Sequence, residues 1–193
     1  ALISSAVIHS LSTKAETNNA NSFYKKGLKK YDQNDLKGAL AEFTKAIKIN
    51  PEYGDAYYNR GLVKKELLDI QGAIEDYTKA IKINPNDGRA YYDRAILKEG
   101  RRDFQGAIED YKKAINIDPN DGRAYYNRAI LKEGQTDIKG AIGDYTKVIK
   151  INPEYGDAYY NRALLKQELQ DNKGAIEDYT KAIKINPENA DAY

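Results

Sequence analysis

The residues best equipped for binding chemistry form one series with a spacing of 34 residues. The series is Asn21, Asp55, Arg89, Arg123 and Asp157. A planar guanidinium group suits a carboxylate or a phosphate, to which it can donate two parallel hydrogen bonds. One interpretation is that Arg89 and Arg123 together hold an anionic group of a partner. The alternative is local pairing of each arginine with the aspartate two residues before it, Asp87 or Asp121.

Residues that could carry out catalysis or hold a metal ion are missing from the pattern. The sequence has no cysteine, and its one histidine, His9, lies outside the repeated part of the chain. Nucleophilic catalysis needs an activated side chain beside a base. Gly106 and Gly140 open predicted helices, but without the lysine and serine or threonine of a phosphate-binding loop. We therefore predict that the protein is not an enzyme and has no cofactor or metal site.

Charge is dense but balanced, with 31 Lys and Arg against 29 Asp and Glu and a formal net charge of +2. This balance predicts that nucleic acid is not a partner. Lysines do recur in the second half of each repeat, where they either form a solvated face or contact phosphate or acidic lipid headgroups. No stretch approaches the roughly 20 apolar residues that span a bilayer, so no membrane span is expected.

Prolines divide the chain at intervals of 34 residues. They are Pro51, Pro85, Pro119, Pro153 and Pro187. Strict self-similarity of this length indicates a stack of identical supersecondary units. We predict five repeats, over residues 20–53, 54–87, 88–121, 122–155 and 156–189, with residues 190–193 as the start of a truncated sixth. Residues 1–19 fit no repeat.

Each repeat contains two runs of helical periodicity, 55–67 and 70–83 in the second repeat. An aspartate precedes every second run, where it can cap a helix: Asp35, Asp69, Asp103, Asp137 and Asp171. Proline ends the second run, and a glycine three residues later, such as Gly54, is expected to allow the turn into the next repeat. The pattern predicts antiparallel helix pairs.

Aromatic and small residues repeat in columns that predict a packed core. One aromatic column is Phe23, Tyr57, Tyr91, Tyr125, Tyr159 and Tyr193, and another is Phe43, Tyr77, Tyr111, Tyr145 and Tyr179. Alanines such as Ala73 and Ala80 recur beside them, as close packing of large against small side chains requires.

A basic and an acidic residue change together from repeat to repeat. The pairs are Arg60 with Asp76, Arg94 with Asp110, Arg128 with Asp144 and Arg162 with Asp178, and the first repeat has Lys26 with Glu42. The joint change predicts that each pair joins the two helices of its repeat. The alternative is two solvated faces that merely repeat.

The order of an aromatic residue, Gly or Ala four places later, Ala-Ile, a second aromatic residue, Ala and Pro resembles the tetratricopeptide repeat family. The resemblance covers residues 20–189. It implies an all-α fold, a right-handed superhelical solenoid of antiparallel helix pairs, in which the first helices line a concave groove. Arg60 and its equivalents depart from the family pattern, which usually has Leu there.

By this resemblance, the groove is lined by tyrosines and, one turn later, by aliphatic residues. They are Tyr24, Tyr58, Tyr92, Tyr126 and Tyr160, followed by Leu28, Leu62, Ile96, Ile130 and Leu164. Beside them run Lys25, Asn59, Asp93, Asn127 and Asn161. Such a row offers amphipathic contact area to a peptide, and asparagine amides can pair with its backbone. The alternative is that part of the row packs against the neighbouring repeat.

We expect a non-catalytic scaffold or adaptor that binds a peptide or protein segment in this groove. One alternative is a structural module that self-associates through the uncapped C-terminal end. Another is an accessory subunit of a membrane-associated complex. The apolar residues 1–15 resemble the tail of a secretory signal peptide, which would place the protein in the periplasm or a lumen. Otherwise they form an extra helix of a cytoplasmic protein, with a hinge at residues 16–19.

Overall fold

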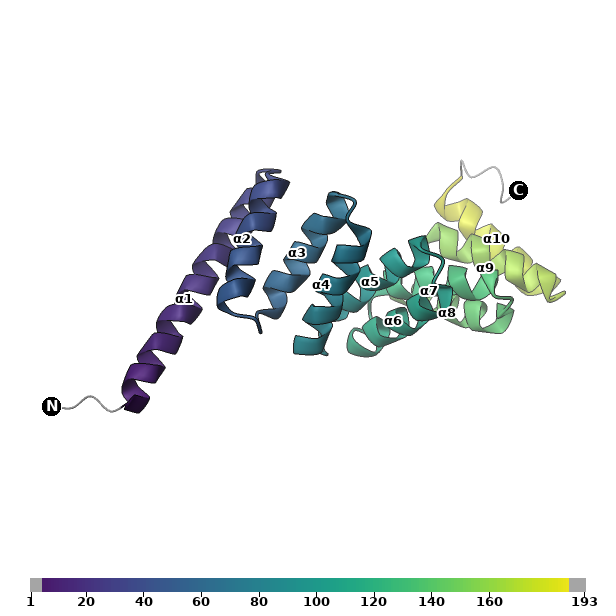
Figure 1. Ribbon diagram of the computed structural model, residues 1–193. Coiled ribbons are helices and arrows are strands. Elements are labelled where there is room, and N and C mark those ends of the chain that lie inside the picture. The colour runs from purple at the N-terminus through teal and green to yellow at the C-terminus, as the bar shows by residue number, and fades with distance from the viewer. Residues whose placement is uncertain (1–4, 188–193) are drawn as a thin grey trace. The chain divides into compact units, whose positions relative to one another are not determined.

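The computed structural model describes residues 5–187, and over this range the chain is helical with no strand (Figure 1). The helices are α1 (Ser5–Asp32), α2 (Leu36–Ile49), α3 (Gly54–Glu66), α4 (Ile70–Ile83), α5 (Gly88–Gly100), α6 (Phe104–Ile117), α7 (Gly122–Gly134), α8 (Ile138–Ile151), α9 (Gly156–Glu168) and α10 (Asn172–Ile185). The all-α class and the two helices of each repeat are therefore confirmed. The expected sixth repeat, at residues 190–193, lies outside the described residues.

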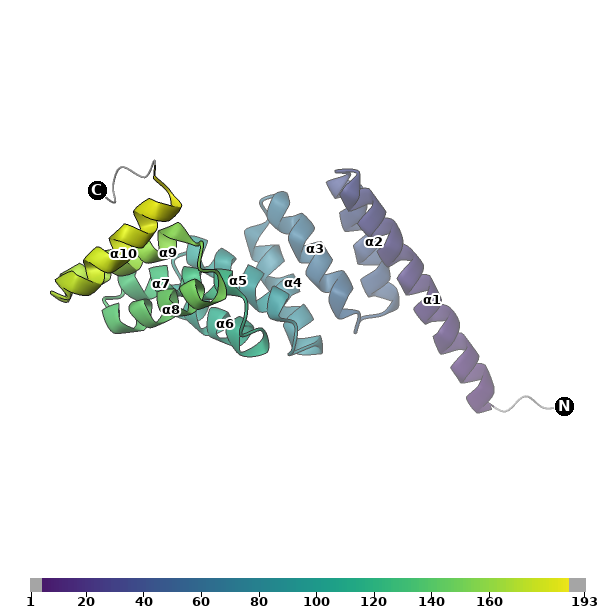
Figure 2. The same ribbon diagram turned by 180° about the vertical axis from the view of Figure 1, so that it is seen from behind.

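The chain forms two compact units, residues 1–97 and 98–193. Helices α1 to α4 and most of α5 belong to the first unit, and α6 to α10 belong to the second. Within each unit, the two helices of a repeat run antiparallel and side by side, as α3 and α4 do in Figure 1 and again from behind in Figure 2.

Each second helix begins at the predicted aspartate cap. Asp69 accepts a hydrogen bond of 3.0 Å from the backbone N–H of Gly72, which is one of the unpaired donors of the first turn. A Cβ atom on Gly72 would collide with that carboxylate. The same arrangement recurs at Asp35, Asp103, Asp137 and Asp171. Aspartate and glycine therefore work as one capping motif.

The expectation about Gly54 was wrong. No described glycine has a positive φ, so the turn between repeats does not use glycine's conformational freedom. Positive φ occurs instead between the two helices of each repeat, at Asn34, Leu68, Arg102, Thr136 and Gln170. Gly54 is needed for its size, since a Cβ there would lie 3.3 Å from the Ile83 side chain.

The core follows the aromatic column of the second helices. Phe43, Tyr77, Tyr111 and Tyr145 are all fully buried, and the alanines beside them are buried as well. The first-helix column is less buried than predicted, because Phe23, Tyr57, Tyr91 and Tyr159 are only half-buried. Arginine covers the exposed ring faces of this column: the Arg60 guanidinium lies 5.5 Å from the Tyr57 ring centroid.

The N-terminal segment is part of the first helix. α1 runs without interruption from Ser5 to Asp32, so the hinge expected at residues 16–19 does not occur. Among the described helices, none combines the length and the apolar character needed to cross a membrane.

Candidate functional site

The predicted groove tyrosines all lie on first helices and are partly exposed. We call Tyr24, Tyr58, Tyr92, Tyr126 and Tyr160 the tyrosine row. The aliphatic residues one turn later are Leu62 and Ile96, which are half-buried, and Ile130 and Leu164, which are 41% and 40% exposed. Within each unit, residues of this kind present apolar area with hydroxyl groups beside it.

The polar residues beside the tyrosine row tie neighbouring repeats together. Asn59 Nδ2 donates to the Tyr24 hydroxyl (3.1 Å), and Asn161 Nδ2 donates to the Tyr126 hydroxyl in the same way (3.1 Å). Where aspartate replaces asparagine, the direction reverses, and the Tyr58 hydroxyl donates to Asp93 Oδ2 (2.8 Å). These groups therefore hold the tyrosines in place, and pairing of the amides with a peptide backbone stays a prediction.

A second group of residues covers the ring faces of the tyrosine row, and sequence reasoning missed it. The Tyr53 ring packs against Tyr24 in a tilted arrangement with centroids 4.9 Å apart, and Tyr155 packs against Tyr126 in the same way at 5.1 Å. On Tyr58 the same place is taken by the Arg89 guanidinium, 4.6 Å from the ring centroid. The signal was present, because Tyr-Gly-Asp leads into the second and fifth repeats, whereas Asp-Gly-Arg leads into the third and fourth.

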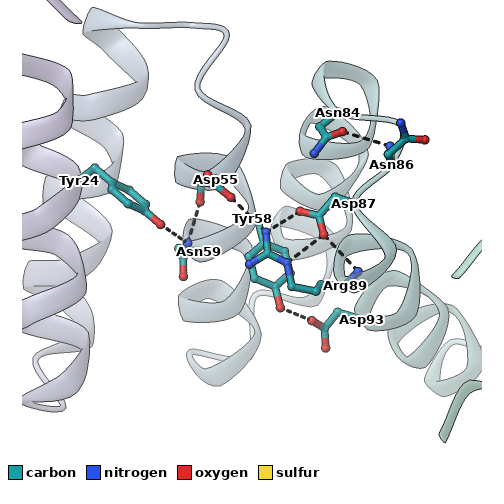
Figure 3. A network of polar contacts seen from close by, with 9 residues as sticks. All are labelled: Tyr24, Asp55, Tyr58, Asn59, Asn84, Asn86, Asp87, Arg89 and Asp93. Carbon is teal, nitrogen blue, oxygen red and sulfur yellow. Dashed lines mark hydrogen bonds and ion pairs between the residues drawn. The ribbon is translucent and has the colours of Figure 1, made fainter. Parts of the chain in front are cut away.

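Arg89 is held by two aspartates (Figure 3). Its Nε and Nη2 donate to the two oxygens of Asp87, each at 2.9 Å, and Nη2 also reaches Asp55 Oδ1 at 3.1 Å. Asp87 is buried, whereas the Arg89 and Asp55 side chains are 59% and 54% exposed. The local pairing expected for this arginine is confirmed.

Arg123 makes the matching contacts in the second unit, donating from Nε and Nη2 to Asp121 at 3.0 Å each. Its side chain is 72% exposed. Arg89 and Arg123 belong to different units, and each has its own aspartate. Joint binding of one anion by both arginines therefore stays a prediction.

Three of the predicted pairs between the two helices of a repeat form buried clusters. Arg60 donates from Nη2 and Nε to the two oxygens of Asp76 at 2.7 and 2.8 Å, and Lys64 Nζ lies 2.9 Å from the same carboxylate. Asp76 is only 3% exposed. Arg128 with Asp144 and Lys132, and Arg162 with Asp178 and Lys166, repeat the geometry. The lysine was not predicted, although it recurs four residues after the arginine.

The pair predicted in the first repeat is not formed. Glu42 Oε1 binds Lys45 of its own helix at 2.8 Å, and Oε2 has no hydrogen-bond partner among the described residues. Lys26 lies over the Phe23 ring instead, 5.2 Å from its centroid. Lysine lacks the planar fork of arginine, and glutamate is longer and more flexible than aspartate.

Burial raises the pKa of the Tyr58 hydroxyl, and the charge of Asp93 raises it further. Burial is also the main reason for the raised pKa of Tyr24 and Tyr126. The hydrogen bonds to Asp87 raise the pKa of Arg89. With their pKa raised above 10, Tyr24, Tyr58 and Tyr126 are neutral phenols at physiological pH.

Two clefts lie away from the tyrosine row. One, of about 710 Å³, is lined by Tyr57, Lys79, Lys82 and other residues of α3 and α4. The other, of about 490 Å³, is lined by Tyr125, Lys147 and Lys150 among others. An extended peptide needs a long strip more than a deep cavity, so the tyrosine row remains the better candidate. Among the described residues, no cluster of His, Cys, Asp or Glu could hold a metal ion.

Comparison with protein families gives matches along most of the chain. A model described as TPR repeat matches residues 27–67 and 103–135. Models described as Tetratricopeptide repeat match residues 54–87 and 156–189, and residues 122–155. No curated protein matches the sequence.

Solved structures match the fold. YrrB, described as a TPR protein with an unusual peptide-binding site, has a TM-score of 0.80 at 21% identity, covering 95% of this chain and 94% of its own. A tetratricopeptide repeat protein from Parabacteroides merdae has a TM-score of 0.78 at 20% identity, covering 91% and 70%. MamA from Desulfovibrio magneticus RS-1 has a TM-score of 0.76 at 19% identity, covering 89% and 97%.

Proposed function

The chain belongs to the tetratricopeptide repeat family, and on this basis we propose that it is a non-catalytic scaffold that binds a peptide or protein segment along the tyrosine row. The observation that carries the proposal is the exposure of the row and of the aliphatic residues beside it. Ile130 and Leu164 are about two-fifths exposed. Aromatic and aliphatic side chains arranged along a rigid helix face lose little entropy when they are covered by a partner.

The position of the row supports a peptide ligand. The tyrosines are fixed by hydrogen bonds from the next repeat, such as that of Asn59 to Tyr24, so their ring edges are already oriented. Preorganised contacts reduce the ordering cost of binding. YrrB, which is similar in fold, is described as having a peptide-binding site. The predicted site residues, from Tyr24 to Leu164, are the surface that we assign to the partner.

Affinity capture with the full chain as bait tests the proposal. The double substitution Ile130→Asp and Leu164→Asp places charge on exposed apolar positions of the row. Because these side chains are exposed, the packing of the core should not change. We expect at least a tenfold loss of captured partner, because burial of an unpaired carboxylate opposes binding. The matched control is Leu68→Asp between α3 and α4, at a position that is 82% exposed and outside the row. Equal capture by the bait and the double variant would refute the proposal.

The exposure of Ile176 on α10, 65%, favours a second candidate function. This function is self-association through the last repeat. A β-branched apolar side chain of that exposure on α10 offers a site for another copy of the chain. Sedimentation at increasing concentration should then show assembly that Ile176→Asp abolishes. Sedimentation as a monomer at every concentration would remove this candidate.

A further inference from the structure

The stretches that lead into the second and fifth repeats are identical in sequence. Residues 47–60 and 149–162 both read Ile-Lys-Ile-Asn-Pro-Glu-Tyr-Gly-Asp-Ala-Tyr-Tyr-Asn-Arg. The stretch ends in the first turns of α3 and α9, where an aspartate and a tyrosine stand three residues apart. Residues at this spacing are neighbours on one helix face. The two repeats therefore present the same Asp and Tyr pair: Asp55 with Tyr58, and Asp157 with Tyr160.

In the second repeat, this pair holds an arginine of the chain itself. The Arg89 guanidinium lies 4.6 Å from the Tyr58 ring centroid, and its Nη2 donates to Asp55 Oδ1 at 3.1 Å (Figure 3). Stacking on an aromatic face and a charge-assisted hydrogen bond are the two interactions that suit a guanidinium group. Asp55 and Tyr58 thus form a slot for arginine, and we call the equivalent pair Asp157 and Tyr160 the fifth-repeat slot.

The fifth-repeat slot has the same support but holds no arginine of the described chain. Tyr160 packs on Tyr179 with centroids 5.8 Å apart, as Tyr58 packs on Tyr77 at 5.8 Å. Asp157 is exposed, and it forms no ion pair with any residue between 5 and 187. The sequence position that corresponds to Arg89 is Asp191, which carries the opposite charge.

We propose that the fifth-repeat slot binds an arginine side chain of the partner. This inference rests on the proposed function and adds the chemistry of one contact to it. Asp157 supplies the carboxylate and Tyr160 supplies the ring face, and Leu164, which is 40% exposed, lies one turn further along α9. Lysine should bind the slot more weakly than arginine. Its ammonium group is not planar, so it cannot stack on the ring while it also donates to the carboxylate.

Asp157 also has a structural role, since a carboxylate in the first turn stabilises a helix. That role is shared by Asp55 in the first turn of α3. It does not depend on what contacts the ring of Tyr160, so the two roles can be separated by experiment.

The test is titration of the full chain with the peptide acetyl-Gly-Arg-Gly-amide, followed by NMR of ¹³C-labelled tyrosine rings. We expect saturable shifts of the Tyr160 ring, assigned with Tyr160→Phe, and at least fivefold weaker binding of the lysine peptide. Asp157→Asn keeps the shape of the side chain and should weaken binding roughly tenfold. Unchanged Tyr160 signals, or equal affinity in Asp157→Asn, would overturn the proposal.

The substitution Arg89→Ala should create a second binding site for the arginine peptide, in the second repeat. The substitution empties the slot in the second repeat, so the same arginine peptide should now shift Tyr58 as well as Tyr160. The control is Asp55→Asn combined with Arg89→Ala, which should remove the Tyr58 response alone. The two proposals can fail separately. If the arginine peptide binds but Ile130→Asp and Leu164→Asp do not change partner capture, the slot is supported and the groove function is refuted. Loss of capture without peptide binding would refute the slot alone.

Discussion

The first two repeats have the same fold but connect their two helices differently. In the second repeat, Asp76 receives Arg60 and Lys64, and both oxygens of the carboxylate are bonded. In the first repeat, Glu42 is also buried, at 7% exposed, yet it binds only Lys45 of its own helix. A buried carboxylate in the same place is thus fully satisfied in one repeat and half satisfied in the other.

The arginine of the second-repeat cluster makes one further contact, to the preceding repeat. Arg60 Nη1 also reaches Thr44 Oγ1 of the preceding repeat at 3.3 Å, and Arg162 reaches Thr146 at 2.9 Å. One guanidinium therefore joins its own second helix to the preceding repeat's second helix. For Arg128 of the fourth repeat, Lys112 stands at the threonine position, and Arg128 still binds both oxygens of Asp144. The difference between the first two repeats therefore follows from the planar fork of arginine, which lysine lacks.

The largest expected effect comes from breaking the second-repeat cluster. Asp76→Ala leaves Arg60 and Lys64, whose side chains are 16% and 19% exposed, without their carboxylate. Removing one partner of a buried ion pair costs about 3–5 kcal/mol. We expect hydrogen exchange of the α3 and α4 amides to accelerate accordingly, since repeat arrays open locally.

Glu42→Ala is the matched change in the first repeat. Lys45 is 52% exposed and remains solvated, so the loss should be at most about 1 kcal/mol. Similar acceleration of exchange in both variants would contradict the distinction between the two repeats.

Much of the fold could be predicted from the sequence because its determinants are local. The aspartate caps and the proline stops act within one turn of the chain, and the joint change of Arg60 and Asp76 pointed to their contact. The predictions that failed depended on side-chain geometry, which the sequence does not give. Lys26 and Glu42 kept the charges of the pair, but charge type alone does not reveal that the buried carboxylate needs the planar fork of arginine.

The candidate site was predicted less completely than the fold. The periodicity and the family resemblance placed Tyr24 and Tyr58 on one face, but they did not show which side chains cover the rings. Tyr53 and Arg89 take that role from the segment between repeats, one as a ring and one as a guanidinium. Because different residue types cover equivalent tyrosines, no single sequence pattern marks the covering residues.

A smaller effect is expected at the core tyrosines, where the repeats also differ in how a buried polar atom is satisfied. The Tyr145 hydroxyl donates to Glu133 at 3.3 Å, whereas the Tyr77 hydroxyl is buried without a partner among the described residues. The position equivalent to Glu133 is Lys65, which pairs with Asp93. Tyr77→Phe should therefore raise the free energy of unfolding by about 1 kcal/mol, and Tyr145→Phe should lower it by a similar amount.

Urea denaturation followed by circular dichroism would measure both changes, provided that the m value stays constant. Phe43 is the natural precedent, because the first repeat has phenylalanine at this position. Destabilisation by Tyr77→Phe equal to that by Tyr145→Phe would show that the buried hydroxyl has a partner in solution.

The smallest effect concerns the residue of positive φ between the helices of a repeat. The first repeat has Asn34 there, at φ 60°, whereas the fourth has Thr136, at φ 62°. A β-branched residue is strained in this left-handed conformation, which asparagine tolerates. Thr136→Asn should stabilise the protein by about 0.5–1 kcal/mol, and Asn34→Thr should destabilise it by a similar amount, both measured as shifts of the urea midpoint. Effects of the same sign from the two exchanges would mean that the loop is governed by contacts other than its backbone conformation.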